Sequence, residues 1–309
     1  MNQHASPPPA HATGPADPEH AEHPHPQHRE HPEQPSNLIT PATGTTDPTP
    51  DPALTSTPGP SSTWHHLGIL AHSTEGAALS FLSFCQEGFH RLGDHDHPDV
   101  TLDYIPFGRS MPAWDAGDHD TVRRTLAASV TRLARTGAAF FICPDNTAHL
   151  ALERPGDALA LPGLHIAEVV ADQAARDGRT RVAVLGTAYT MAGDVYPRAL
   201  AARGLTAELP SPQDRRTIND IIFRELVNGV FTDHSRRAYV DIIERLATER
   251  GCDAVALACT EIPLLITPAD SPLPTLDSTR LLSSAAFEAA TGARPFPTWR
   301  GGPTTPREP

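Results

Sequence analysis

The chain has 309 residues and a formal net charge of −13 at pH 7, and every one of its 24 Lys or Arg residues is an arginine. The acidic balance argues against a nucleic-acid partner, because phosphate binding needs an excess of basic side chains on one face. The lack of lysine excludes a pyridoxal-phosphate enzyme, which holds its cofactor as a Schiff base on a lysine.

The sequence also indicates the compartment. No apolar stretch approaches the roughly 20 residues of a membrane span, and the N-terminus lacks the apolar core of a signal peptide. The cysteines are Cys85, Cys143, Cys252 and Cys259, and they show no paired metal-ligand spacing. Free thiols in a reducing compartment fit this pattern better than disulfides. We therefore expect a cytoplasmic protein without membrane contact.

The two ends of the chain differ from its middle. Residues 1–62 are rich in Pro, His, Thr, Ser and Asp and contain few large apolar side chains. Such a segment buries too little surface to offset its ordering entropy, so we expect a disordered tail. Its histidine tract between His20 and His31 could capture a metal, although a solvated tail is the favoured interpretation. Residues 293–309 predict a second, shorter tail.

The first half of the ordered region alternates strands and helices. In chain order, apolar runs predict strands at 66–71, 100–105 and 138–142, and helical spacing predicts helices at 77–92 and 118–137. The first turn carries Ser73 and Thr74 before a helix N-terminus, where backbone N–H groups can bind a carboxylate. Arg109 follows the second strand and could clamp a carboxylate. A surface arginine explains Arg109 equally well.

The second half repeats this arrangement. It predicts strands at 181–186 and 254–258, helices at 164–176, 196–203, 218–226 and 235–250, and an alanine-rich helix that ends at 290. The turn after 181–186 carries Thr187 and Thr190 and resembles the turn with Ser73 and Thr74. This internal similarity indicates two related lobes.

The alternation of strands and helices predicts an α/β fold. We expect two similar lobes, each a mostly parallel sheet flanked by helices, with the active site in the cleft between them. The first lobe comprises residues 63–163 together with 271–292, and the second comprises 164–270.

Two of the predicted strands end in reactive side chains. The strand at 138–142 is followed by Cys143, Pro144, Asp145, Asn146 and Thr147, and the strand at 254–258 is followed by Cys259, Thr260 and Glu261. Open α/β sheets place their chemistry at the carboxyl ends of strands. Two such ends predict one site that both lobes share.

These strand ends carry a resemblance. Residues 146–149 (Asn-Thr-Ala-His) and 259–264 (Cys-Thr-Glu-Ile-Pro-Leu) resemble the aspartate/glutamate racemase family, and the similarity extends over about residues 65–292. It implies an amino-acid racemase without cofactor or metal that uses two thiols on opposite faces of the α-carbon. It also implies a small carboxylate or amino-acid substrate, and it leaves a homodimer open. One departure is clear, since Asp145 stands where the family has its first cysteine.

The resemblance implies a role for each site residue. Asp145 and Cys259 are the expected catalytic pair. The expected substrate-binding residues are Ser73, Thr74, Arg109, Asn146, Thr147, Thr187, Thr190, Thr260 and Glu261. Helix N-termini lower the pKa of cysteine, so we expect a thiolate at Cys259. Glu261 could bind the substrate ammonium, orient Cys259, or act only as an acid in the first turn of a helix.

The protonation of Asp145 separates the remaining hypotheses. If burial raises its pKa, Asp145 and Cys259 can act as a two-base racemase. If Asp145 stays ionised as a helix cap, Cys259 alone exchanges protons, as in the related arylmalonate decarboxylases. A decarboxylase or a cis–trans isomerase is then the alternative, and a non-catalytic small-molecule binder is the third.

Several other residues have simpler explanations. Cys143 could replace Asp145 as the reactive group, but the motif points to Asp145. His149 lies one helical turn after Asp145 and could hydrogen-bond across that turn or simply pack, and packing with support is its favoured role. Ala188 occupies a turn where family members often carry a basic residue for a distal carboxylate, which puts an acidic substrate side chain in doubt.

Overall fold

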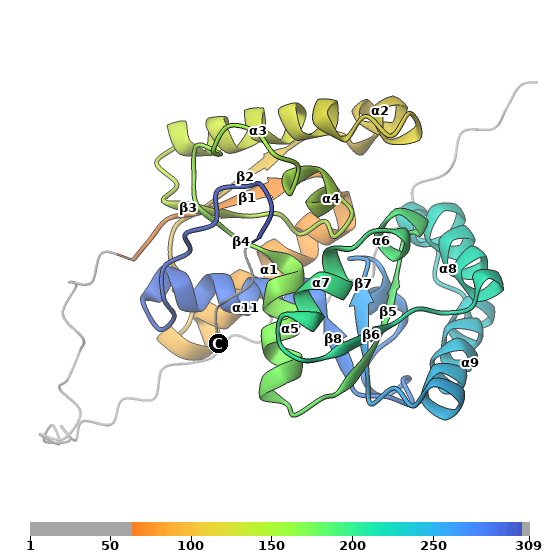
Figure 1. Cartoon of the computed structure of the whole chain (residues 1–309). Helices are drawn as coiled ribbons and strands as arrows, with labels where there is room; N and C mark the ends of the chain where they lie inside the picture. The colour runs from red at the N-terminus through yellow and green to blue at the C-terminus, as the bar shows by residue number, and fades with distance from the viewer. Residues whose placement is uncertain (1–63, 305–309) are drawn as a thin grey trace, which may run out of the picture. The chain divides into compact units, whose positions relative to one another are not determined.

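The computed structural model describes residues 64–304. The predictions for residues 1–62, including the histidine tract, lie outside this range. Residues 64–304 form two parallel four-stranded sheets within one compact unit (Figure 1). The predicted α/β fold with two similar lobes is therefore confirmed.

The first sheet has the strand order β2-β1-β3-β4. Its strands are β1 (Leu67–Ala71), β2 (Val100–Tyr104), β3 (Phe140–Ile142) and β4 (Gly163–Leu164), and the helices that follow them are α1 (Thr74–Leu92), the 3-10 helix η1 (Phe107–Arg109), α2 (Met111–Asp115), α3 (His119–Arg135) and α4 (Ala148–Leu152). Successive side chains of a strand face opposite sides of the sheet. Ile69 accordingly packs in the core under α1, whereas Leu70 packs in the core under α3. Figure 1 shows α3 over one face of this sheet and α1 with α11 (Ser278–Thr291) over the other.

The second sheet repeats that order as β6-β5-β7-β8. Its strands are β5 (Arg181–Gly186), β6 (Thr206–Glu208), β7 (Ala254–Ala258) and β8 (Thr275–Asp277), and its helices are α5 (Ile166–Arg176), α6 (Ala188–Ala192), α7 (Val195–Ala201), α8 (Pro212–Arg224), η2 (Leu226–Asn228), α9 (Asp233–Arg250) and α10 (Ile262–Leu265). Val184 packs toward α5 and α7, and Leu185 packs toward α8 and α9. Both layers are visible in Figure 1.

The stretch 271–292 divides between the two sheets, contrary to its expected place in the first lobe. Strand β8 pairs with β7, with Leu276 opposite Ala256, and so belongs to the second sheet. Helix α11 packs against α1 instead. The physical reason is backbone hydrogen bonding. In the described chain β8 pairs with β7 alone, and this parallel pairing places it in the second sheet.

The stretch 293–304 is packed, so the prediction of a tail fails for these residues. The amide of Gly163 donates a 2.7 Å hydrogen bond to the carbonyl of Trp299. The Trp299 ring stacks on His149 with 5.9 Å between ring centroids, and Phe296 packs edge-on against Phe140. Few apolar residues occur here, but the partly buried Trp299 and one face of the more exposed Phe296 contact the first lobe and hold the segment.

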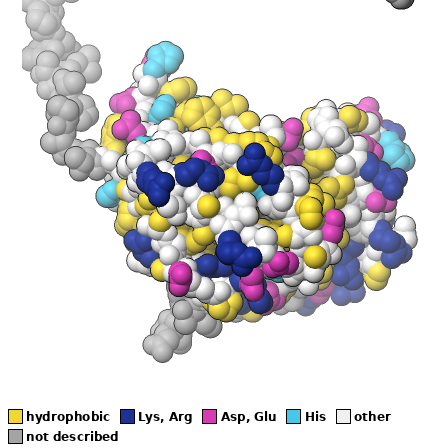
Figure 2. Space-filling model, turned by 90° about the horizontal axis from the view of Figure 1, so that it is seen from above, with side chains coloured by type: hydrophobic (Ala, Val, Ile, Leu, Met, Phe, Trp, Pro, Cys, Tyr) yellow, Lys and Arg dark blue, Asp and Glu magenta, His cyan; other side chains and the backbone are white. Residues whose placement is uncertain are grey.

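The exterior of residues 64–304 carries charges of both signs. Figure 2 shows arginine side chains on one face as separate groups among apolar and uncharged ones. Arginines of the described chain form ion pairs, such as Arg132 with Asp103 and Arg154 with Asp120. No helix in this part of the chain is long and apolar enough to cross a membrane.

Candidate active site

The central strands of the two sheets direct their carboxyl ends toward one cavity. Its volume is about 380 Å³. Its polar lining comprises Ser73 and Thr74 after β1, Asp145, Asn146 and Thr147 after β3, Thr187 after β5, and Cys259, Thr260 and Glu261 after β7, together with Glu75. The structure thus brings together all but two of the residues that the sequence assigns to the site, the exceptions being Arg109 and Thr190.

Hydrogen bonds between these side chains join the two sheets. The Ser73 hydroxyl donates to Glu261 Oε1 over 2.6 Å, and the Thr147 and Thr187 hydroxyls are 2.9 Å apart. Gly76 in the first turn of α1 permits this approach, because a Cβ there would lie 2.3 Å from Thr260 Oγ1. The polar lining of the cavity is therefore also part of the contact between the lobes, to which α5 and α11 contribute as well.

Asp145 is a buried carboxyl with a partner on each oxygen. The Ala148 amide donates to Oδ1 over 3.0 Å, and His72 Nδ1 lies 2.8 Å from Oδ2. His72 Nε2 lies 3.2 Å from the Ser110 hydroxyl. Since an ionised carboxylate only accepts, the hydrogen on His72 Nδ1 is the one donated to Asp145. The sequence did not single out His72, although it directly follows β1 and precedes Ser73.

These partners determine the ionisation of Asp145. Burial by itself raises the pKa of a carboxyl group. Here the hydrogen bond and charge of His72 outweigh burial, with a further contribution from the Ala148 amide, so the pKa of Asp145 lies below its usual value. Asp145 is therefore a carboxylate at neutral pH.

Cys259 is a thiol rather than the expected thiolate. It is buried, and its Sγ–H donates to Glu261 Oε2 over 2.9 Å. Burial raises the pKa of the thiol well above its ordinary value, and the charge and hydrogen bond of Glu261 raise it further. The prediction fails because α10 has only four residues, while a carboxylate lies in direct contact with the sulfur. A short helix offers little dipole to offset that charge.

Glu261 is the centre of a small hydrogen-bond network. Its carboxylate accepts hydrogen bonds from the hydroxyls of Ser73 and Thr260 and from the Cys259 thiol. It is 4% exposed. Among the three interpretations from the sequence, these contacts favour an orienting role toward Cys259.

The amide and hydroxyl groups after β3 are also engaged. Asn146 Nδ2 donates to the Ser278 hydroxyl over 3.0 Å, and its Oδ1 accepts from the Tyr196 hydroxyl over 2.6 Å. The Thr147 hydroxyl contacts those of Thr187 and Thr190. Thr190 does not line the cavity and supports the two hydroxyls that do.

The remaining residues lie away from the cavity. Arg109 is exposed at the end of η1 and does not line the cavity. Cys143 is buried in the core under α3. His149 is buried, which agrees with a packing role. Its Nδ1 also donates across the helical turn to the Asp145 carbonyl, and its Nε2 accepts from the Ile166 amide. Burial lowers the pKa of His149 to about 3.

The cavity also has an apolar wall that the sequence did not reveal. Its members are Tyr104, Phe107, Met111, Ile222, Phe223 and Val227. The first three lie in or after β2, and the others lie in α8 and η2. In the sequence these residues resemble ordinary apolar positions of two separate segments. Only the fold places them on one surface.

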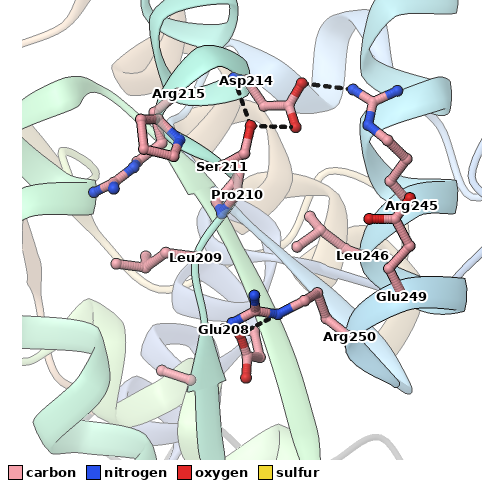
Figure 3. A pocket seen from close by; sticks show the side chains of 12 residues that line it. Glu208, Leu209, Pro210, Ser211, Asp214, Arg215, Arg245, Leu246, Glu249 and Arg250 are labelled. Carbon is pink, nitrogen blue, oxygen red and sulfur yellow. Dashed lines mark hydrogen bonds and ion pairs between the residues drawn. The ribbon is translucent and has the colours of Figure 1, made fainter.

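A second, larger cavity of about 610 Å³ lies between β6, the start of α8 and α9 (Figure 3). Four of its six charged side chains form two ion pairs, Arg245 with Asp214 and Arg250 with Glu208. These pairs account for most of the charges without a ligand. Among residues 64–304, no group of three His, Cys, Asp or Glu side chains is placed to hold a metal ion.

Known proteins are similar to this chain in sequence and in fold. The family profile of the Asp/Glu/hydantoin racemases matches residues 70–286. The broad specificity amino-acid racemase RacX of Bacillus subtilis is 25% identical over 225 residues, which cover 71% of this chain and 95% of RacX.

Solved structures agree with this match. A putative Asp/Glu racemase from Yersinia pestis superposes with a TM-score of 0.64 at 28% identity, over 73% of this chain and 99% of the other. An aspartate racemase homologue from Pyrococcus horikoshii OT3 has a TM-score of 0.61 at 24% identity, over 73% and 99% of the two chains, and shows the same fold. The family match spans more than half of the chain, and the strand-end motifs lie within it. The chain therefore belongs to the Asp/Glu/hydantoin racemase family and is an isomerase of the racemase type.

Proposed function

We propose that the chain is a cofactor-independent amino-acid racemase or epimerase in which Asp145 and Cys259 act on opposite faces of the substrate α-carbon. One observation carries the proposal. The two residues follow β3 and β7, which hold equivalent places in sheets of the same strand order, and both side chains line one cavity. A pair so related can approach a bound α-carbon from opposite sides.

The protonation states support one direction of proton flow in the resting enzyme. The Asp145 carboxylate takes the α-proton from one face, and the Cys259 thiol gives its proton to the other face. The C–H bond on the first face breaks, a C–H bond forms on the second, and the configuration inverts. Asp145 is then protonated and Cys259 is a thiolate, and reaction of the opposite enantiomer restores the starting state.

The intermediate needs stabilisation as its carboxylate becomes an enediolate. Positioned acid–base groups contribute roughly 10²–10⁴-fold, so preorganised donors must supply most of the acceleration. The hydroxyls of Thr147 and Thr187 exchange their mutual hydrogen bond for bonds to the substrate carboxylate. The carboxylate of Glu75, which also lines the cavity, favours the substrate ammonium.

We assign His72 a positioning role in this scheme. Its Nδ1–H fixes Asp145 Oδ2, and Ser110 fixes the ring through Nε2. The ring is fully buried and packs against Phe107 with 5.0 Å between centroids. His72 thereby keeps the carboxylate ionised and fixes its orientation, although it does not line the cavity.

The same hydrogen bonds favour a second candidate function. A carboxylate that accepts two hydrogen bonds and has a lowered pKa is a weaker base. If Asp145 does not exchange a proton, Cys259 alone protonates or deprotonates one face. The enzyme would then be a single-thiol decarboxylase or cis–trans isomerase of an α-substituted carboxylic acid.

Proton exchange in D₂O distinguishes the two candidates. We would follow the α-proton by NMR over both enantiomers of the common amino acids, for wild type, Asp145→Asn and Cys259→Ser. Exchange with inversion that both substitutions abolish supports the two-base racemase. Exchange without inversion that survives Asp145→Asn supports the single-thiol enzyme. No exchange in wild type refutes racemisation, and CO₂ release from an α-substituted malonate then supports decarboxylation.

A further inference from the structure

The lining of the candidate active site has a polar end and an apolar wall. Its polar end holds Asp145 and Cys259, and its apolar wall is formed by side chains from both lobes. Tyr104, Phe107 and Met111 come from the first lobe, and Ile222, Phe223 and Val227 from the second. A ligand whose α-carbon lies between Asp145 and Cys259 must therefore direct its side chain at this wall.

The charged groups of the cavity all have one sign. Its acidic members are Glu75, Asp145 and Glu261. Within the described part of the chain, no arginine or histidine lines the cavity, and Arg109 is exposed outside it. The polar end can bind the ammonium and carboxylate on the α-carbon. A second carboxylate at the wall would meet apolar side chains and the Tyr104 hydroxyl, which already pairs with the Thr74 hydroxyl over 2.7 Å, but no cation. Placing an unpaired charge in such surroundings is strongly unfavourable.

We propose that this enzyme acts on amino acids with uncharged, apolar side chains and discriminates against aspartate and glutamate. The inference rests on the proposed function for its reaction, but it concerns which side chain the cavity accepts. The volume of about 380 Å³ is near the lower end of small-molecule pockets, roughly 300–1,000 Å³, which suits one amino acid of medium size. Leucine, methionine and phenylalanine represent the substrate class.

The test compares turnover and binding. Wild type is assayed for α-proton exchange in D₂O with leucine, methionine, phenylalanine, aspartate and glutamate, each as both enantiomers. In parallel, Cys259→Ser is titrated calorimetrically with the same amino acids. We expect kcat/KM, and affinity, to favour the apolar substrates by about tenfold or more. Equal or better exchange or binding of aspartate or glutamate overturns the inference.

The binding measurement separates this inference from the reaction itself. If no amino acid exchanges its proton, racemisation fails, while the order of affinities still supports or overturns the apolar class. A further variant tests the charge argument directly. Phe223→Arg places a cation at the wall and should shift the preference toward aspartate or glutamate by roughly tenfold.

Two matched variants control for the change of residue 223. Phe223→Leu keeps the wall apolar and should preserve the wild-type preference. Val230→Arg adds the same charge in the exposed stretch after η2, outside the cavity lining, and should also leave the preference unchanged. A shift as large in Val230→Arg as in Phe223→Arg would show that net charge decides the preference, and it would overturn the role of the wall.

Discussion

Glu261→Gln offers a direct test of the hydrogen-bond network at the candidate thiol. In wild type the Cys259 Sγ–H donates to Glu261 Oε2 over 2.9 Å, and the charge of Glu261 raises the pKa of the thiol beyond the effect of burial. Glutamine keeps the size of the side chain but removes its charge. The pKa of Cys259 should therefore fall.

The size of this effect follows from the hydrogen bond. A hydrogen bond to a charged group contributes roughly 1.5–3 kcal/mol, and about 1.4 kcal/mol is a factor of ten in an equilibrium constant. The thiolate fraction of Cys259 at mildly alkaline pH should rise roughly 10–100-fold in Glu261→Gln. Since the thiolate is the nucleophile, the rate of alkylation should rise with it.

The assay is alkylation with iodoacetamide as a function of pH, followed by peptide mass spectrometry that separates Cys259 from the other cysteines. Glu261→Asp is the first control, because it keeps the charge. Glu75→Gln is the second, because it removes a carboxylate from the same cavity without a hydrogen bond to the sulfur. An unchanged or slower rate in Glu261→Gln would refute the assignment of Glu261 as the acceptor. An equal acceleration in Glu75→Gln would show that only the total charge matters.

Three further predictions concern stability. Gly76→Ala should destabilise the fold by about 1–3 kcal/mol, the usual cost of overpacking, because the added Cβ would lie 2.3 Å from Thr260 Oγ1. Urea unfolding measures this loss of stability. Gly108→Ala is the control and should be close to neutral, because a Cβ there meets nothing within 4 Å. Burial lowers the pKa of His149 to about 3, below its unfolded value of about 6.5. Between these two pH values the unfolded state binds more protons, so the wild-type protein should lose stability as pH falls through this window. This group contributes at most about 1.4 kcal/mol per pH unit to the loss. His149→Gln should be less stable at pH 7 but show a shallower dependence in urea unfolding, and an unchanged slope would contradict a neutral buried ring. Trp299→Ala should lower the free energy of unfolding by roughly 2–3 kcal/mol. This is less than the roughly 3–5 kcal/mol for a fully buried ring, because Trp299 is only partly buried. An unchanged free energy in urea unfolding would contradict a structural role for residues 293–304.

The hydrogen bonds around Asp145 give the two proposed catalytic groups different protonation states. A carboxylate held by His72 and the Ala148 amide lines the same cavity as a protonated Cys259. Two identical thiols would have similar proton affinities, whereas a carboxylate and a buried thiol do not. In the proposed two-base reaction, this resting protonation favours removal of the proton on the Asp145 face.

Much of the fold can be predicted from the sequence. Apolar runs such as 138–142 and 254–258 mark the central strands because a strand buried on both faces must be apolar along its length. Their polar ends at Asp145 and Cys259 mark the site, because parallel sheets collect their carboxyl ends on one edge. Both signals are local, and each can be identified without knowledge of the partner strand.

Other features depend on residues that are distant in the chain. His72 and Asp145 are 73 residues apart, and neither position by itself indicates a pair. The apolar wall combines Phe107 with Phe223 only because two lobes face each other. The protonation of Cys259 depends on where Glu261 points, which the spacing of two residues does not determine.

The C-terminal stretch and one edge strand were also not predictable from sequence patterns. Composition alone suggested a tail after 292, yet Phe296 and Trp299 pack against the first lobe. The edge strand β8 is three residues long, too short for periodicity to reveal. Pattern and motif thus predicted the two-lobed α/β fold, the strands that carry the candidate site and the two positions proposed to react. Only the tertiary structure decided the ionisation of those positions and the shape of the cavity, because both depend on neighbours that folding brings together from distant parts of the chain.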